Sequence, residues 1–167
     1  MNNVGIQGLV ANNIDYKGIV TLSQKIGGKK VKLAKIHNAG GRALFDFLAD
    51  CLMGDFDSAK INRPSKITLL YRDSDNNLTK ADNTPFIYIT TKPERVLTNL
   101  DEGVVRYSFT ISQDIFFGTT FNAIGLYTDS ETNIENYAAY CQIDSADLGD
   151  ISVSSVLLLD WELHISN

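Results

Sequence analysis

Residues that commonly form disulfides or bind metal ions are scarce in this sequence. It contains only two cysteines, Cys51 and Cys141, and two histidines, His37 and His164. Neither histidine belongs to a Cys/His/Asp spacing that is typical of metal sites, and both are expected to be structural or exposed. The cysteines lie far apart, and Cys51 falls within an apolar helical pattern, so we expect two free, buried thiols and no disulfide.

Long apolar runs and an excess of positive charge are missing too. No stretch approaches the roughly 20 apolar residues of a membrane span, and the first residues lack the basic and apolar regions of a signal peptide. The 15 Lys and Arg are outnumbered by 20 Asp and Glu, which leaves a net charge of -5 and argues against a nucleic-acid partner. We expect a protein of the cytoplasm, or of a particle assembled there, with no membrane or nucleic-acid partner.

Motifs of known catalytic and phosphate-binding sites are also missing. There is no Gly-x-Ser-x-Gly elbow and no dinucleotide-binding glycine fingerprint, and Lys29 is not followed by the Ser or Thr of a phosphate loop. A catalytic pair of carboxylates like that of glycosidases stays possible, because any two of the 20 acidic residues could lie close together in the fold. Nothing in the sequence singles out one pair. We assign no catalytic or cofactor-binding residue and do not expect an enzyme.

Two acidic groups share some features with metal sites. Residues 73–77 begin like a calcium loop, but Leu78 stands in place of the glycine and Thr84 in place of the closing glutamate. Asp46 and Asp50 stand one helical turn apart with no His or Glu partner nearby, which is typical of a solvated helix face. No metal ligand is therefore predicted.

Apolar residues, by contrast, are plentiful and arranged mostly as strands. They make up 44% of the 167 residues, enough for the core of one domain. Residues 116–128 form the densest apolar segment and predict a central strand buried on both faces, with the alternating runs 105–111 and 157–165 paired beside it. Further strands are expected at residues 18–25, 30–36, 66–71, 86–91 and 137–143, and the last strand at 154–165. The first two should form a hairpin around Gly27 and Gly28, and the polar residues 55–64 and 73–77 should form turns.

One amphipathic helix is expected at residues 42–53, ended by Gly54. Its apolar side is predicted to cover one face of the sheet, with Leu48 at the centre of the contact and Asp46 and Asp50 on the opposite side. The apolar positions are Leu44, Leu48 and Leu52, flanked by Phe45, Phe47 and Cys51.

These elements predict a mainly β fold. We expect an antiparallel β-sandwich-like domain at residues 18–167 with the one amphipathic α-helix packed on it. Residues 1–17 are rich in Asn and Gly and predict an N-terminal arm that is flexible or becomes ordered against a partner.

The C-terminal third resembles a known family. Residues 121–127 read Phe-Asn-Ala-Ile-Gly-Leu-Tyr and are followed by an acidic turn at Asp129, a strand at 137–142 and a closing apolar strand that ends at residue 167. This order resembles the N-terminal attachment domains of bacteriophage tail-collar and tail-fibre proteins, in which a phrase like Asn-Glu-Ile-Gly-Leu-Tyr precedes a short turn and a closing strand. Ala123 departs from the usual acidic residue. Residues 39–48 are similar to small phage structural proteins.

The resemblance implies a virion structural protein that works through protein–protein contacts. We therefore expect a homo-oligomer of the tail, collar, neck or head-fibre region, located in the virion and assembled in the host cytoplasm. Its partners would be other copies of itself and neighbouring virion proteins. The alternative is a soluble β-sandwich module that binds a ligand or carbohydrate, and oligomer formation without a ligand would separate the two hypotheses.

Overall fold

A computed structural model of the protein describes residues 15–96, 102–144 and 156–166. The fold is 53% strand and 17% helix, which confirms the mainly β prediction. The strands are β1 (Asp15–Ile26), β2 (Lys29–Gly40), β3 (Pro64–Arg72), β4 (Leu78–Lys80), β5 (Ile87–Tyr88), β6 (Glu94–Val96), β7 (Glu102–Ile111), β8 (Ala123–Thr128), β9 (Ala139–Gln142) and β10 (Val156–Ser166). The helices are α1 (Arg42–Met53), α2 (Phe56–Asn62), the 3-10 turn η1 (Ala81–Asn83) and α3 (Gln113–Phe116).

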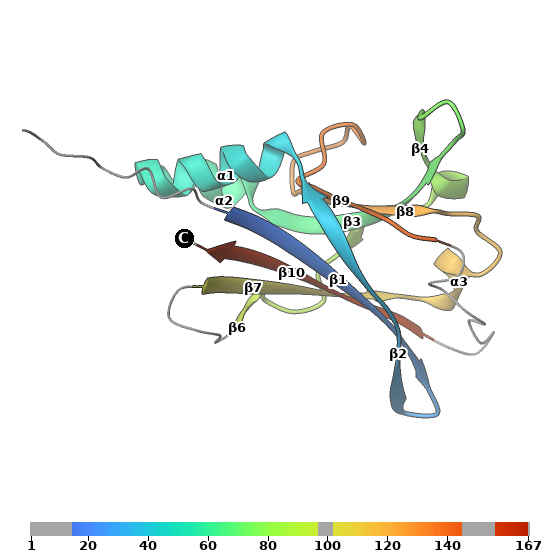
Figure 1. The fold of residues 1–167 in the computed structure, drawn as a ribbon. Coiled ribbons are helices and arrows are strands. Elements are labelled where there is room, and N and C mark those ends of the chain that lie inside the picture. Colours follow the sequence, from blue (N-terminus) through green and yellow to red (C-terminus); the bar gives the residue numbers. More distant parts are fainter. Residues whose placement is uncertain (1–14, 97–101, 145–155, 167) are drawn as a thin grey trace, which may run out of the picture.

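The strands form two antiparallel layers that share β2. The order along the sheet is β4-β3-β8-β9-β2-β1-β10-β7-β6, with β5 also paired to β3. From Lys29 to Asn38, β2 pairs with β1, whereas Ala39 and Gly40 pair with β9 in the other layer (Figure 1). The β-sandwich-like prediction is therefore confirmed, and the two layers are continuous through this one strand.

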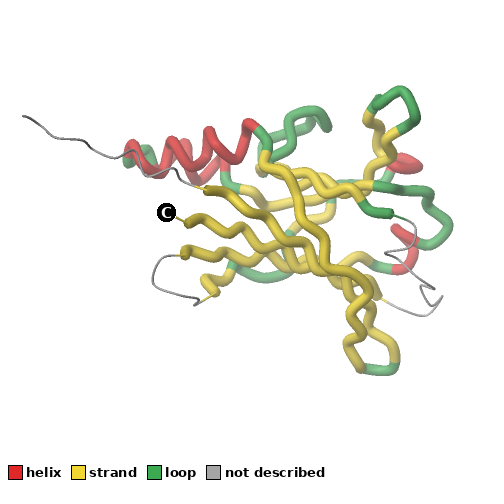
Figure 2. The backbone as a smooth tube through the Cα atoms, viewed as in Figure 1, coloured by secondary structure: helices red, strands yellow, loops and turns green. Residues whose placement is uncertain are grey.

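A second connection joins the layers on the opposite side. After β5 has paired with β3, the N–H of Ile89 donates to the carbonyl oxygen of Ser65 at 2.9 Å. The next N–H, of Thr90, donates to the carbonyl oxygen of Ser108 on β7 at 3.2 Å, and β6 then pairs with β7. The segment from β5 to β6 is thus hydrogen-bonded to β3 in one layer and to β7 in the other, so the two layers are connected on this side as well (Figure 2).

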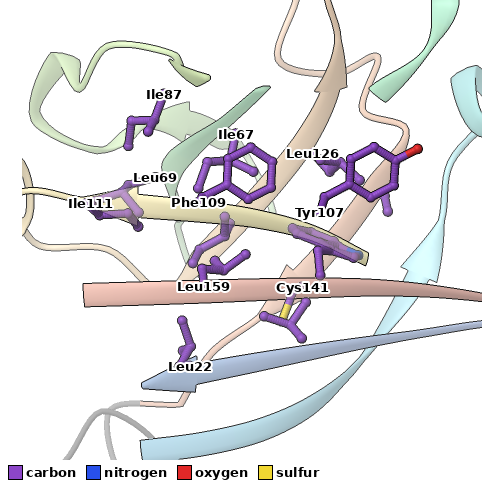
Figure 3. Packing of buried hydrophobic residues seen from close by; sticks show 14 of the residues in the cluster. Leu22, Ile67, Leu69, Ile87, Tyr107, Phe109, Ile111, Leu126, Cys141 and Leu159 are labelled. Atoms are coloured by element: carbon purple, nitrogen blue, oxygen red, sulfur yellow. The ribbon is translucent and has the colours of Figure 1, made fainter. Parts of the chain in front are cut away.

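The hydrophobic core lies between the layers. Every residue of β8 is buried, while β7 and β10 bury alternate residues, as one-sided strands do. Side chains from both layers meet there, among them Phe109, Leu159, Ile67 and Leu126 (Figure 3). Trp161 on β10 is the largest fully buried side chain.

The predicted central strand needs two corrections. It begins at Ala123 and not at residue 116, because Phe116 ends α3 and Gly118, at a φ of 79°, turns the chain before the strand. Its neighbours are β3 and β9, whereas β7 and β10 pair with each other in the other layer. Which strands pair depends on how segments that are distant in the sequence pack together. The alternation of apolar residues within one strand does not predict its partner.

Helix α1 has the predicted bounds and ends at Gly54, whose φ is 75°. Leu44 is 1% exposed and belongs to the core, but Leu48 is only partly buried, and Phe45 and Cys51 are exposed. The apolar side of α1 packs against the core as predicted, Leu48 included, but the predictions that Leu48 is its deeply buried centre and that Cys51 is buried are wrong. The reason is that α1 runs along the outside of the sandwich beside α2, so one side of the helix packs against the core and the residues on its other side do not (Figure 1).

Other differences are local. The hairpin is confirmed, with Gly27 and Gly28 at φ angles of 55° and 83°. Residues 55–64, predicted as a turn, contain α2, which begins because the side chain of Asp55 accepts from the N–H of Ser58 at 3.0 Å. The strand predicted at 86–91 shrinks to β5, and β7 begins at Glu102, before the predicted run 105–111. The predicted strand at 137–143 is reduced to β9. Of the predicted arm, residues 1–14 lie outside the described residues, and 15–17 belong to β1.

Candidate interaction surfaces

Ionised side chains join β7 and β10 on the outer face of their layer. Arg106 donates from Nε and Nη2 to Oε1 of Glu162 at 2.9 and 2.7 Å, and Nε2 of His164 lies 3.2 Å from Oε2 of the same carboxylate. Burial raises the pKa of Glu162, but the hydrogen bonds from Arg106 and His164 outweigh it and hold the pKa below its usual value. His164 is therefore oriented by a carboxylate within the sheet surface.

A second cross-strand group stands one step along the same strands. The hydroxyl of Ser108 lies 2.7 Å from Oδ1 of Asp160, and Nζ of Lys30 lies 2.8 Å from Oδ2. Burial raises the pKa of Asp160, but the hydrogen bonds from Lys30 and Ser108 lower it more strongly. The Ser108 hydroxyl thus donates to a carboxylate and not to an imidazole, an arrangement that ties strands together and does not activate a nucleophile.

The acidic residues that the sequence singled out are engaged in local hydrogen bonds. Asp73 accepts from the N–H groups of Asp75 and Asn77 at 2.9 and 2.8 Å, and its pKa is lowered, chiefly by the side chain of Asn77. Asp50 accepts from the side chain of Asn62 at 3.0 Å, and the exposed Asp46 lies 3.7 Å from Arg42. Within the described ranges, no three His, Cys, Asp or Glu residues come together as metal ligands.

The remaining singled-out residues are His37 and the cysteines. His37 is exposed on β2. The two cysteines form no disulfide; Cys141 is buried, as expected, whereas Cys51 is exposed. These three residues do not form a metal-binding cluster with one another.

One buried cation was missed by sequence reasoning. Lys66 on β3 is only 3% exposed, and its Nζ donates to the carbonyl oxygen of Asp129 at 2.7 Å. The same atom lies 4.3 Å from the centroid of the Phe86 ring, and Nζ of Lys80 lies 4.0 Å from it. Burial lowers the pKa of Lys66. The alternating pattern of β3 gave no sign of this, because it placed residue 66 on the face away from Ile67.

One exposed row of residues on α1 is apolar. Phe45 is 54% exposed and Met53 is 77% exposed, and the exposed Ala49 stands between them. These residues are four apart, so they lie in one row along the helix. We call Phe45, Ala49 and Met53 the α1 stripe.

A groove opens beside the start of α1. It has a volume of about 330 Å³ and is lined by the first turn of the helix and by the connection between β8 and β9. Its charged lining residues are Arg42, Asp46, Glu131 and Glu135, and Tyr137 adds an aromatic side. An adjoining hollow of about 140 Å³ shares Asp46 and Glu131. We call the whole feature the acidic groove.

The β1–β2 hairpin extends beyond the body of the domain (Figures 1 and 2). Ile26 and Val31 near its tip are 37% and 45% exposed. The exposed residues around them are mostly lysines. The hairpin therefore combines positive charge with two exposed apolar side chains.

Every helix within the described residues is too short or too polar to cross a bilayer. No protein-family model, no curated protein and no solved structure matches the chain significantly.

Proposed function

We propose that the chain is a structural protein of a bacteriophage virion, in the tail, collar, neck or head-fibre region. It acts by contacts with other copies of itself and with neighbouring virion proteins in a symmetric assembly.

The α1 stripe is the observation that carries this proposal. Complete burial of a side chain such as Phe or Met contributes about 1.5–3 kcal/mol, and most of that contribution is still unrealised where half or more of the side chain faces water. Phe and Met are also enriched in protein interfaces relative to other surfaces. A row of such residues along one helix is a surface suited to a protein partner.

The residues of the family resemblance support the proposal in a second way. Residues 123–128 form β8, the acidic turn follows at Asp129, and β9 and β10 complete the order. This is the succession of strand, short turn and closing strand on which the resemblance rests.

Sedimentation velocity of the purified chain tests self-association. We expect an oligomer at micromolar concentration without any ligand, and Met53→Glu combined with Ala49→Glu should dissociate it, because a buried charge without a partner is costly. Replacing two exposed polar residues away from the helix, Thr91→Glu and Thr110→Glu, is the matched control and should leave the oligomer intact. A wild-type chain that stays monomeric and associates only with a carbohydrate would favour the ligand-binding alternative.

The virion assignment has its own test. Antibody labelling of particles from the phage that encodes this chain should mark one position in the tail, collar, neck or head-fibre region at symmetric intervals. Particles that lack the chain would contradict the assignment.

A further inference from the structure

Charge is strongly segregated along the chain. Residues 16–45 carry seven of the 15 basic residues and none of the 20 acidic ones, so the rest of the chain carries eight basic against 20 acidic residues. The basic part is centred on the hairpin, where Lys30 is bound to Asp160. The other hairpin lysines are Lys17, Lys25, Lys29, Lys32 and Lys35, all of them exposed.

The hairpin also carries an open sheet edge. From Lys29 to Asn38, β2 has a strand partner on its β1 side only, within the part of the chain that the structure describes. Such an edge offers unpaired backbone N–H and C=O groups to another chain. Antiparallel pairing of this edge with the same edge of a second copy would place lysines near lysines, which is unfavourable. The edge therefore fits an acidic partner surface.

This molecule itself provides an acidic, concave surface. Asp46 and Glu135 are exposed in the acidic groove, and the partly buried Glu131 also lines it. Its one basic residue, Arg42, lies 3.7 Å from Asp46 and is almost fully exposed. The elements that line the groove, which are the start of α1 and the connection between β8 and β9, lie far from the hairpin tip, so a chain's own hairpin does not reach its groove (Figure 1).

We propose that the hairpin of one copy docks into the acidic groove of the next copy. The lysines around the tip pair with the groove carboxylates, and Ile26 covers the ring of Tyr137. Because the two surfaces differ, the contact is heterologous and repeats head to tail, which produces a closed ring or an open filament. This inference rests on the proposed self-assembly and adds a second contact to the one proposed for the α1 stripe, both of which the assembly needs.

Paired charge reversals test the contact. The hairpin variant is Lys29→Glu with Lys32→Glu and Lys35→Glu, and the groove variant is Asp46→Lys with Glu135→Lys. Each variant alone then has a hairpin and a groove of the same sign, and we expect its self-association to weaken at least 100-fold in sedimentation. Mixed one to one, the two variants present complementary pairs in both directions, so assembly should return. The control is Arg63→Glu with Lys92→Glu and Arg95→Glu, an equal charge change at exposed sites elsewhere, and it should assemble like the wild type.

Several results would overturn the inference. A hairpin variant that assembles like the wild type would do so, and so would a mixture that stays monomeric although circular dichroism shows both variants folded. If the reversed hairpin does not fold, Lys29→Gln with Lys32→Gln and Lys35→Gln should still weaken assembly, and no effect would again refute the contact. A monomeric wild type would instead refute the proposed self-assembly itself, so the two failures are distinguishable.

Discussion

Gly41, the residue before α1, is predicted to tolerate no larger residue without a loss of stability. A Cβ atom at this position would overlap the backbone carbonyl oxygen of Tyr137 and come within 2.8 Å of its ring. The backbone is not free to retreat, because the N–H of Gly41 donates to the carbonyl oxygen of Ala138 at 2.7 Å. Gly41→Ala therefore has to shift the start of α1 away from the connection between β8 and β9.

The expected cost follows from two effects. Overpacking costs about 1–3 kcal/mol, and weakening the Gly41–Ala138 hydrogen bond adds about 1 kcal/mol, so unfolding free energy should fall by roughly 2–4 kcal/mol. For a chain of this length that corresponds to a melting temperature lower by roughly 5–15 °C. Urea unfolding followed by circular dichroism measures the change.

Gly54, at the other end of α1, is the informative comparison. Its φ of 75° is unfavourable for other residues, but a Cβ atom there would meet nothing within 4 Å. Gly54→Ala should cost about 1–2 kcal/mol, and Gly54→Asn less, because Asn tolerates the left-handed conformation. At Gly41, where the φ is an ordinary -106°, Asn should be worse than Ala because it is larger. A loss below about 0.5 kcal/mol for Gly41→Ala, the range of surface substitutions, would refute the steric argument.

Three further predictions concern the core, the outer face and the polar loop. Leu44→Ala should cost about 2–5 kcal/mol and Leu48→Ala clearly less, because only Leu44 is fully buried, and equal losses in urea unfolding would contradict this. The lowered pKa of Glu162 means that its contribution to stability is complete above its unfolded pKa of about 4.3 and is lost as the pH falls through its lower folded pKa. Glu162→Gln should therefore flatten the loss of stability measured from pH 5 downward, and an unchanged slope would count against the Arg106 pair. Millimolar calcium should leave the melting temperature unchanged, because the oxygens of Asp73 already accept hydrogen bonds within their turn, whereas a rise of several degrees would reveal binding.

The parts of the fold that the sequence predicted well depend on local signals. Helix α1 has the expected bounds, and it ends where expected because Gly54 adopts a left-handed conformation there. The hairpin formed as expected because Gly27 and Gly28 adopt the positive φ angles of a tight turn. In both cases the decisive residue lies within or directly beside the element that it limits.

The parts that were predicted wrongly depend on distant contacts. The pairing of β7 with β10, and of β8 with β3, is decided by which apolar faces meet across the whole chain. The short strands β5 and β6 exist because their segment reaches from β3 to β7, and strands of two and three residues carry too little pattern to predict their partners. The burial of Lys66 depends on a carbonyl group more than sixty residues away.

The error at α1 has a different cause, because the sequence contained the relevant signal. Leu44, Phe45, Leu48 and Met53 do not fit on one narrow side of a helix, and their spread indicates more apolar surface than a single contact can cover. The structure divides them: Leu44 enters the core, while Phe45 and Met53 face outward. An apolar arc that is wider than the contact with the sheets indicates a further contact, and the proposed assembly would place another chain on the α1 stripe.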